Sequence, residues 1–553
     1  MDLELATTQQ SPSKIVLTGF MGTGKSSAGR ILARETGRDF VDTDELIVER
    51  AGKSVAELFF ESGEAAFRNY ERQIARELSD QENLVIATGG RLMLDPLNAQ
   101  LLNRKALVIC LTASVGEIVT RTGSDLSHRP LLEGDSAVKQ IDSLLQERQV
   151  GYSQYNQVDT SGKNVQEVAR ELIELSSQLV KDGRWYRQLT SRIPVQHPIG
   201  AYEVVIGKNL LTSLSQVVGL QSPCAVVTDN NVAAHYVNNL GDLDRLTTII
   251  TPPGEENKTL ETLRLIYDQL LEAGMDRRGT LITLGGGVVG DMGGFAAATY
   301  MRGIKLVQCP TSLLAMVDAS VGGKTGVDLP QGKNLVGSFK QPEAVIADLD
   351  TLKTLPGSEL LSGMAEVVKG AIIASPDLLG YVRDLAPTIA PSALNADSAL
   401  PLADLHTIIV EAVMIKRDIV ETDPFERDRR RLLNLGHTFA HAIEQVSGYT
   451  VRHGEAVSIG LVASSMLSAR LGYCDKDISM RIGDVLKQLR LPIHIPSKLS
   501  PEQLLQAMRS DKKVESSQLR FVLIRDIGDV YVESQVPESA VMEVLDGLRK
   551  PGI

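Results

Sequence analysis

Cysteine is scarce in this chain. The 553 residues include only four cysteines, and no two of them have the CxxC spacing of a metal or redox site. The first 13 residues also lack the basic start and the apolar run of a secretory signal. Both features favour a reducing environment, and we expect a cytoplasmic protein.

Long apolar runs and an excess of positive charge are missing as well. No long uncharged apolar stretch occurs, which argues against a membrane span, while a hydrophobic content of 43% argues against a disordered chain. The formal net charge of −12 argues against nonspecific binding to nucleic acid. We therefore expect small-molecule substrates, and a phosphorylated one must be bound by local lysines and arginines.

The length predicts several domains, since ~100–200 residues per domain is usual. An α/β domain with a parallel sheet is expected over residues 1–180, a polar linker containing two prolines over 181–200, a second α/β domain over 201–355 and an all-α domain over 356–553. The strands expected from apolar runs are 14–18, 84–87, 106–111, 202–206, 225–228, 246–251 and 280–284.

The most specific motif of the first domain is GFMGTGKS at residues 19–26. A strand is predicted just before it and a helix just after it, which is the setting of a phosphate-binding loop. Gly22 and Gly24 let backbone N–H groups converge on phosphate oxygens, while Lys25 and Ser26 are placed for phosphate and Mg²⁺. The motif predicts binding of a nucleoside triphosphate with Mg²⁺.

Charged residues further along the first domain predict an acceptor site. Asp42 follows a strand end and is expected to reach Mg²⁺, while Asp44 can hold a substrate hydroxyl. A guanidinium binds carboxylate or phosphate in a fork, so arginines are candidates for a carboxylate clamp and a lid cation. The candidates are Arg68, Arg129 and Arg148, with the glycine pair Gly89-Gly90 after a strand.

Six motifs of the first domain together resemble those of shikimate kinase. They are GFMGTGKS, DTD at 42–44, GEAAFRNYE at 63–71, ATGG at 87–90, RPLL at 129–132 and RQVGY at 148–152. The resemblance implies that ATP and Mg²⁺ are bound by Gly22, Gly24, Lys25, Ser26, Asp42 and Arg129, the last as a lid residue. It implies that shikimate is bound by Asp44, Arg68, Gly90 and Arg148, with Lys25, Asp44 and Arg129 acting in catalysis.

One position departs from that family's pattern. The family has three consecutive glycines where this chain has Gly89-Gly90-Arg91. The side chain of Arg91 would either crowd the acceptor pocket or turn away from it. The alternatives for this domain are a generic small-molecule kinase with a phosphate-binding loop, or a kinase fold that has lost its activity.

In the second α/β domain an apolar run leads into a tight glycine turn that includes Gly286 and Gly287. A dinucleotide pyrophosphate could lie against the backbone N–H groups of such a turn, although the spacing is not GxGxxG. The side chains that offer acceptors and a donor to a ribose are those of Asp229, Glu255, Lys258 and Asp291.

Cations follow among glycines, as a small phosphorylated or carboxylated substrate requires in an acidic protein. Each alone would be a surface residue, but glycine beside lysine in GGK at 322–324 and GKN at 332–334 lets a ligand approach the backbone closely. The candidates are Arg302, Lys324, Lys333, Asn334, Lys369, Lys416 and Arg430.

Three of the eight histidines fall within residues 437–453. His437 and His441 lie four residues apart in a helical stretch and so share one face, and His453 follows after a short loop. This grouping predicts a catalytic metal, and spacing alone selects His437 and His441 as ligands. No HExxH motif accompanies them, which argues against a protease, and a carboxylate or water would complete the coordination.

Ordered motifs from residue 202 onward resemble those of 3-dehydroquinate synthase. They are PPGEENKT at 252–259, GGGVVGD at 285–291, YMRG at 300–303, PTSLLAMVDASVGGKTGV at 310–327, GKN, GMAEVVKG at 363–370, LNLGHTFAH at 433–441 and HGEAV at 453–457. The resemblance implies a metal, Zn²⁺ or Co²⁺, held by Glu366, His437 and His453, contrary to the spacing argument. It implies NAD bound by Asp229, Glu255, Lys258, Gly286, Gly287, Asp291, Thr311 and Ser312.

The same resemblance implies a substrate site. Lys324, Lys369 and His441 would act in catalysis, and Arg302 would reach phosphate across a dimer interface. The residues implied to surround the substrate are Arg302, Asp318, Lys324, Lys333, Asn334, Lys369, Lys416, Arg430, Asn434 and His441.

Together the two resemblances imply a bifunctional enzyme of aromatic biosynthesis. The first part would phosphorylate shikimate with ATP, and the second would convert 3-deoxy-D-arabino-heptulosonate 7-phosphate to 3-dehydroquinate and phosphate. A ring hydroxyl would be oxidised by NAD, phosphate would leave and the hydride would return, with no net redox change. We expect a homodimer through the synthase half and no nucleic-acid or membrane partner. The alternative is a related sugar-phosphate cyclase fused to an inactive, regulatory kinase-like domain.

Overall fold

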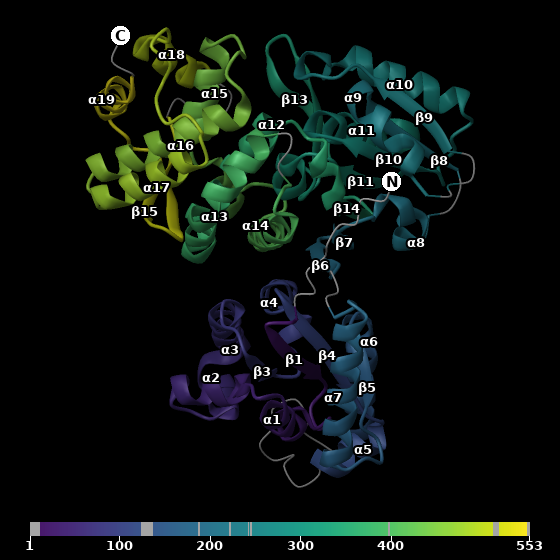
Figure 1. The fold of residues 1–553 in the computed structure, drawn as a ribbon. Helices are drawn as coiled ribbons and strands as arrows, with labels where there is room; N and C mark the ends of the chain where they lie inside the picture. The colour runs from purple at the N-terminus through teal and green to yellow at the C-terminus, as the bar shows by residue number, and fades with distance from the viewer. Residues whose placement is uncertain are drawn as a thin grey trace, which may run out of the picture. The chain divides into compact units, whose positions relative to one another are not determined.

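The computed structural model divides into two compact units, Met1–Leu189 and Thr190–Ile553 (Figure 1). Each unit has its own sheet and its own hydrophobic core. The structure describes residues 11–122, 137–185, 189–220, 223–241, 243, 246–395, 399–511 and 519–549.

The first unit is built on a five-stranded parallel sheet with the order β2-β3-β1-β4-β5. Its central strands β1 and β3 are buried along their whole length and mostly apolar, as expected for a parallel sheet covered on both faces. The strands predicted at 14–18, 84–87 and 106–111 are confirmed. The five strands are β1 (Lys14–Gly19), β2 (Asp39–Asp42), β3 (Leu84–Ala87), β4 (Ala106–Thr112) and β5 (Asn156–Asp159).

Side-chain caps fix where several helices of this unit begin. Ser54 and Glu57 form a capping box at the start of α3, and Asn164 and Glu167 form another at α7. Helix α1 instead follows Gly24, which offers no side chain to cap its first N–H groups. The helices are α1 (Lys25–Thr36), α2 (Thr43–Ala51), α3 (Val55–Ser79), η1 (Leu92–Leu94), α4 (Pro96–Leu102), α5 (Val115–Thr122), α6 (Ala137–Ser153) and α7 (Val165–Lys181).

The second unit contains a seven-stranded sheet with the order β6-β7-β14-β11-β10-β8-β9. All neighbours are parallel except β6 and β7. The strands predicted at 202–206, 225–228, 246–251 and 280–284 are confirmed. The seven are β6 (Ser191–His197), β7 (Gly200–Gly207), β8 (Cys224–Asp229), β9 (Leu246–Thr251), β10 (Thr280–Gly285), β11 (Lys305–Pro310) and β14 (Ala344–Asp348).

Strand β6 lies inside the segment 181–200 that the sequence predicted to be a linker. Its residues alternate between buried and exposed, with Ile193 and Val195 facing the core. Pro194 takes an exposed position, and β6 is an edge strand, where a proline is tolerated because no ladder hydrogen bond depends on its nitrogen. The linker prediction was therefore wrong for these residues. Pro194 indicated a linker, although the apolar residues alternate with polar ones as in a strand.

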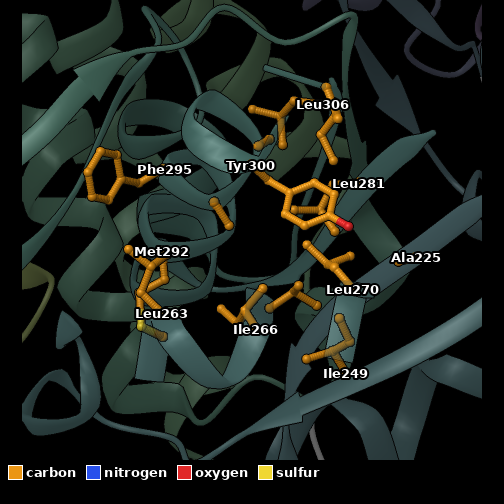
Figure 2. Packing of buried hydrophobic residues seen from close by; sticks show 14 of the residues in the cluster. Ala225, Ile249, Leu263, Ile266, Leu270, Leu281, Met292, Phe295, Tyr300 and Leu306 are labelled. Atoms are coloured by element: carbon orange, nitrogen blue, oxygen red, sulfur yellow. The ribbon is translucent and has the colours of Figure 1, made fainter. Parts of the chain in front are cut away.

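Helices α10 and α11 cover one face of this sheet and form its main core (Figure 2). Leu263 and Ile266 of α10 and Met292 and Phe295 of α11 pack with Leu281 of β10. The helices here are η3 (Leu211–Ser213), α8 (Leu214–Val218), α9 (Asn230–Tyr236), η4 (Val237–Asn239), η5 (Glu255–Asn257), α10 (Leu260–Glu272), α11 (Gly287–Thr299), η6 (Tyr300–Arg302), η7 (Ala315–Ala319) and η8 (Leu349–Lys353). A hairpin, β12 (Lys324–Leu329) and β13 (Gly332–Phe339), lies between η7 and β14.

Beyond Pro356 the chain is mainly helical, as predicted. One hairpin interrupts the helices, and it turns at Gly528, whose φ of 94° suits glycine. Among the described helices, none has the length and apolar character that a bilayer crossing needs. The elements are α12 (Gly357–Ala374), α13 (Pro376–Leu394), α14 (Leu402–Thr422), η9 (Arg429–Asn434), α15 (His437–Val446), α16 (His453–Arg470), α17 (Lys476–Gln488), α18 (Pro501–Asp511), β15 (Phe521–Asp526), β16 (Asp529–Glu533) and α19 (Glu538–Leu548).

Helix α14 is attached to β6 through a buried histidine. His406 Nε2 lies 3.1 Å from the hydroxyl of Ser191, and burial lowers the pKa of His406 to about 4. Because the unfolded chain would bind a proton near pH 6.5, the neutral histidine stabilises the fold above that pH, and this stabilisation is lost as the pH falls from 6.5 toward 4.

We expect the second unit to lose on the order of 3 kcal/mol of unfolding free energy across this pH window. His406→Gln removes the titration but keeps a polar partner for Ser191, so its stability should change less between pH 7 and pH 4.5. Denaturant unfolding followed by far-UV circular dichroism measures this, while fluorescence of Trp185, which packs in the first unit, reports that unit separately. Equal pH dependence in both proteins would contradict the assignment to His406.

Candidate active sites

The glycine loop of the first unit is shaped to surround an anion. Gly22 and Gly24 have φ values of 75° and 90°, which favour glycine, and the uncapped start of α1 follows directly. The ammonium of Lys25 donates to the carbonyl oxygens of Gly19 and Phe20, both at 2.9 Å, so it points back over the loop. This cluster of N–H groups and one ammonium suits the phosphates of a nucleotide.

Asp42 joins this loop to the next strand. Its Oδ2 accepts from the hydroxyl of Ser26 at 2.5 Å, and its Oδ1 accepts from the backbone N–H of Asp44 at 3.0 Å, which caps α2. The sequence thus brings a hydroxyl and a carboxylate, both hard oxygen ligands, to the mouth of the phosphate loop. This donor set fits Mg²⁺.

Asp44 lies over the glycine pair at the end of β3. A Cβ on Gly89 would stand 2.5 Å from Asp44 Oδ1 and would push this carboxylate from its place. The N–H of Gly89 donates to the hydroxyl of Thr43 at 2.9 Å. Gly90 lies beside Arg148, whose Nη1 would be 4.0 Å from a Cβ at that position. The predicted acceptor residues Asp44, Gly90 and Arg148 therefore come together at this edge of the sheet.

Arg148 is buried, with 6% of its surface exposed, and its guanidinium lies 5.2 Å from the ring centroid of Phe20. Its Nε has no hydrogen-bond partner among the described residues. Tyr152, four residues later, donates from its hydroxyl to the carbonyl of Gly90 and so links α6 to the glycine pair. A buried guanidinium with donor capacity left over suits an anionic ligand.

Arg68 is held by two glutamates of its own helix, α3. Its Nη1 contacts Glu71 at 2.6 Å, and its Nη2 contacts Glu64 at 2.8 Å. Burial raises the pKa of Glu71 to about 7, although Arg68 acts in the opposite direction. Sequence reasoning overlooked Glu71, which lies one helical turn after Arg68 and could have been found by that spacing. The predicted lid residue Arg129 lies outside the described residues.

The predicted dinucleotide turn joins β10 to α11. Helix α11 begins after Gly286 with no side-chain cap, so its first N–H groups form the kind of terminus that binds a pyrophosphate. Thr311 donates its N–H to the carbonyl of Gly285 at 2.9 Å, and a Cβ on Gly286 would lie 3.5 Å from the hydroxyl of Ser312. The predicted residues Gly286, Gly287, Thr311 and Ser312 thus lie together around one turn.

The predicted ribose residues form two groups. Asp229 caps α9 by accepting from the N–H groups of Asn231 and Val232. Lys258 is buried and donates to Asp291 at 2.7 Å and to Asn334 at 2.6 Å, with Glu255 3.9 Å away. The structure therefore assembles Glu255, Lys258, Asp291 and Asn334 and gives Asp229 a capping role.

A possible metal site lies at the start of helices α15 and α16. One ligand atom from each of Glu366, His437 and His453 lies within 4.8 Å of the other two, and this is the set among the described residues that could hold a metal ion. Two carboxylates, Glu366 and Glu444, overcome the effect of burial and raise the pKa of His453 to about 10. The position favours positive charge, which a divalent cation would supply, and two imidazoles with one carboxylate suit Zn²⁺ or Co²⁺.

His441 is not in this set. Its ring centroid lies 5.5 Å from that of His437, the two rings meeting edge to face. Burial lowers the pKa of His437 to about 3, so this imidazole is neutral, as a metal ligand must be. The geometry thus supports the three ligands implied by the family resemblance rather than the pair chosen by helical spacing.

Glu444 contacts the ring nitrogen of His453 that does not face Glu366. Sequence reasoning overlooked this glutamate. Its Oε2 lies 3.4 Å from His453 Nδ1, and its Oε1 accepts from Lys333 at 3.4 Å. Lys333 also lies 3.6 Å from Glu255 and 4.7 Å from the ring centroid of Tyr449. A carboxylate on the far nitrogen of a ligating histidine fixes its tautomer and orientation. The signal was present, since Glu444 lies seven residues after His437 on the same helical face.

A buried network of charges adjoins the metal site. Lys369 Nζ lies 2.5 Å from Glu366 and 3.5 Å from Asp318, which also pairs with Lys416. Burial opposes the charge on Glu366, but Lys369 outweighs it and lowers the pKa of Glu366 to about 2. Burial lowers the pKa of Lys416 to about 8 despite Asp318. These are two cations and two anions in one place, so a substrate anion can enter by exchanging partners.

The other predicted substrate residues are arranged differently. Lys324 pairs with Glu426, which accepts from Asn434 at 3.0 Å, so these three form one cluster. Arg430 is fully buried and donates to the backbone carbonyls of Gly322 and Pro424 at 3.0 and 2.7 Å. In this structure Arg430 holds the glycine turn before Lys324 rather than facing solvent.

Arg302 differs from all of these residues. It is exposed, has a positive φ of 66°, and makes no ion pair within the described part of the chain. The implied contact with phosphate across a dimer interface stays a prediction.

Sequence comparisons agree with this division of the chain. Residues 21–176 match the shikimate kinase family, residues 248–362 match the N-terminal part of 3-dehydroquinate synthase, and residues 363–514 match its C-terminal part. The 3-dehydroquinate synthase of Coxiella burnetii is 44% identical over 369 residues, which are 65% of this chain and 99% of that protein. The chain belongs to the 3-dehydroquinate synthase family. A shikimate kinase domain precedes the synthase in the same polypeptide, and both resemblances drawn from the motifs are confirmed.

Further relatives show the same coverage of the synthase half. The 3-dehydroquinate synthase of Crocosphaera subtropica is 38% identical over 370 residues and is matched along its whole length. The structure of 2-epi-5-epi-valiolone synthase from Streptomyces hygroscopicus subsp. jinggangensis, with NAD⁺ and Zn²⁺ bound, is 27% identical. It has a TM-score of 0.59 and covers 65% of this chain and 99% of its own.

A 2-deoxy-scyllo-inosose synthase in complex with carbaglucose-6-phosphate, NAD⁺ and Co²⁺ is 25% identical and has a TM-score of 0.58. It covers 64% of this chain and 99% of its own. The synthase fold is therefore common to enzymes with different products.

Proposed function

We propose that the chain carries two activities in aromatic biosynthesis. The first unit transfers the terminal phosphoryl group of ATP to a hydroxyl of shikimate. The second converts 3-deoxy-D-arabino-heptulosonate 7-phosphate to 3-dehydroquinate and phosphate, with NAD and a divalent metal, Zn²⁺ or Co²⁺. The observation that carries the proposal is that a possible metal site adjoins a buried network of charged groups. Glu366, His437 and His453 could hold the metal, and the network contains Lys369, Asp318 and Lys416.

In the first unit the chain binds, orients and shields the phosphates. Lys25 and the N–H groups at the start of α1 would bind the phosphates, and Ser26 and Asp42 would hold Mg²⁺. Asp44, above Gly89, would accept the proton of the attacking hydroxyl. Arg68 and Arg148 would bind the acceptor carboxylate and keep the hydroxyl aligned with the phosphoryl group.

In the second unit the N–H groups of α11, with Lys258 and Asp291, would bind NAD, and Glu366, His437 and His453 would hold the metal. When bound, NAD supplies a reversible hydride acceptor and the metal polarises substrate hydroxyls. Lys369 and Lys416 would position the anionic substrate after exchanging Asp318 for its carboxylate or phosphate. His441, beside His437 but outside the metal set, would hold or move a proton at a substrate hydroxyl.

The proposal is tested by a paired assay of the purified chain. One arm contains shikimate, ATP and Mg²⁺; the other contains the heptulosonate phosphate, NAD and Zn²⁺ or Co²⁺. We expect shikimate 3-phosphate from the first and 3-dehydroquinate with phosphate from the second, each identified by mass. A phosphate-releasing second arm with a different carbocycle would favour a related sugar-phosphate cyclase, and an inactive first arm would favour a regulatory kinase-like domain.

The synthase half is also proposed to form a homodimer, which would place the exposed Arg302 near a second copy. Sedimentation velocity on the full chain and on Arg302→Ala tests this. The dimer should persist in the variant while the Michaelis constant for the heptulosonate phosphate rises.

A cytoplasmic location, without nucleic-acid or membrane partners, belongs to the same proposal.

A further inference from the structure

The arginine that interrupts the glycine run after β3 is built into an ion-pair network. Arg91 Nη1 lies 3.1 Å from Glu64 Oε1, the same oxygen that Arg68 Nη2 contacts at 2.8 Å. Two guanidinium groups thus lie within hydrogen-bonding reach of one anion. Glu64 and Arg91 are half exposed, so this anion is at the surface of the site rather than in its core.

The backbone accepts arginine here without strain. Arg91 has a φ of −111° and stands just before η1, whereas the glycines of this chain that need a positive φ lie elsewhere. Its side chain is half exposed, and Glu64 holds it beside Arg68. The guanidinium of Arg91 is therefore an ordered neighbour of the predicted acceptor residue Arg68.

A third guanidinium completes the arrangement. Arg148 lies beside Gly90, the residue before Arg91, since its Nη1 would be 4.0 Å from a Cβ on Gly90. Its charge also helps Arg68 and Arg91 to lower the pKa of Glu64, Arg68 having the largest effect. Arg148 is buried, and its Nε has no hydrogen-bond partner among the described residues. Burial raises the pKa of Glu71 to about 7, so at neutral pH this carboxyl only partly neutralises Arg68. The three arginines carry more positive charge than the two glutamates remove.

We propose that Arg91 is a specificity-determining residue that binds the carboxylate of the acceptor together with Arg68 and Arg148, and that Glu64 occupies this place until the acceptor displaces it. The inference rests on the proposed kinase function and adds what this chain does differently. A carboxylate has two oxygens and matches paired guanidinium groups in the same way as the side chain of Glu64. The pocket should therefore discriminate strongly for an anionic acceptor over an uncharged one.

Steady-state kinetics at saturating ATP, with shikimate and with its uncharged methyl ester, test the role of Arg91. Arg91→Ala should raise the Michaelis constant for shikimate about tenfold, the loss of one charged hydrogen bond, with little change in turnover number or in the constant for the ester. Arg91→Lys should recover part of the loss. An unchanged constant for shikimate, or an equal rise for the acid and the ester, would overturn the proposal.

Glu64→Gln tests whether the acceptor displaces Glu64 from the arginines or whether Glu64 only holds them in position. If Glu64 competes with the acceptor, the variant should lower the Michaelis constant for shikimate several-fold, because a competing negative charge is gone. A rise instead would mean that Glu64 positions the arginines, and the displacement would be refuted.

Arg50→Ala and Glu77→Gln are matched controls. These two residues form another arginine–glutamate ion pair, in which the glutamate is on α3, but the pair lies outside the site. Neither change should alter the kinetics. Wild-type protein without any shikimate kinase activity would refute the proposed function itself, which is a different outcome from active enzyme that does not depend on Arg91.

Discussion

We expect Glu366→Ala, His437→Ala and His453→Ala each to lose most of the bound metal and to reduce cyclase turnover at least ~100-fold. Each substitution removes one of the three ligand atoms that lie within 4.8 Å of one another, and water replaces a lost ligand poorly. His441→Ala should behave differently. It should retain close to one metal per chain and still lose turnover, because we propose that its imidazole acts on the substrate rather than on the metal.

Metal content after dialysis against a weak chelator, measured on the four variants, is the readout that does not depend on activity. His235→Ala is a suitable control, since this histidine is exposed and lies on α9, and it should leave metal content and turnover unchanged. Shikimate kinase activity should persist in all five proteins. Metal loss in His441→Ala with retention in His453→Ala would favour the pair chosen by helical spacing and reject the set that includes Glu366.

Local patterns were sufficient to predict most of the fold. Strands β3 and β9 begin and end at the predicted residues, because β3 is a short apolar run and β9 is rich in β-branched residues. Strand β6 was missed because its stability comes from pairing with β7 and from two buried aliphatic side chains, which a proline and flanking charges conceal. The hairpin β15–β16 was also missed, and it lies within a region whose other elements are helices.

The sites were predictable where one motif holds the chemistry and not where distant elements meet. The phosphate loop and the glycine turn after β10 need only neighbouring residues. The partners of the cations come from far along the chain, since Lys324 and Glu426 are 102 residues apart and Lys333 and Glu444 are 111 apart. Composition and spacing identified the lysines, but only the fold selects the glutamates that hold them.

Arg430 shows a second reason why the site in the structure differs from the site expected from the sequence. The family resemblance assigned Arg430 to the substrate, yet in this structure its guanidinium donates to the backbone carbonyls of Gly322 and Pro424. A Cβ on Gly322 would lie 2.5 Å from that guanidinium, so the glycine and the arginine depend on each other. Burial, which the sequence does not reveal, decides whether a charged side chain faces a ligand or supports the backbone.

We expect Lys25→Ala and Asp42→Ala to reduce ATP-dependent phosphorylation of shikimate by roughly 100- to 1000-fold or more while leaving cyclisation nearly intact. Lys25 lies over the phosphate loop and Asp42 contacts Ser26 at 2.5 Å, so both act on charge at the phosphoryl group. The synthase residues belong to a separate compact unit with its own core, so we expect these substitutions to act locally in the first unit.

Coupled assays of both activities on one preparation measure this result. Lys53→Ala and Asp39→Ala are the matched controls, because they remove an exposed lysine and an exposed aspartate from the same unit without touching the loop. Fluorescence of Trp185 shows whether the first unit stays folded in each variant, since this tryptophan packs against the core of that unit. A parallel loss of cyclase and kinase activity in folded Lys25→Ala would mean that the two sites are coupled and would refute their independence.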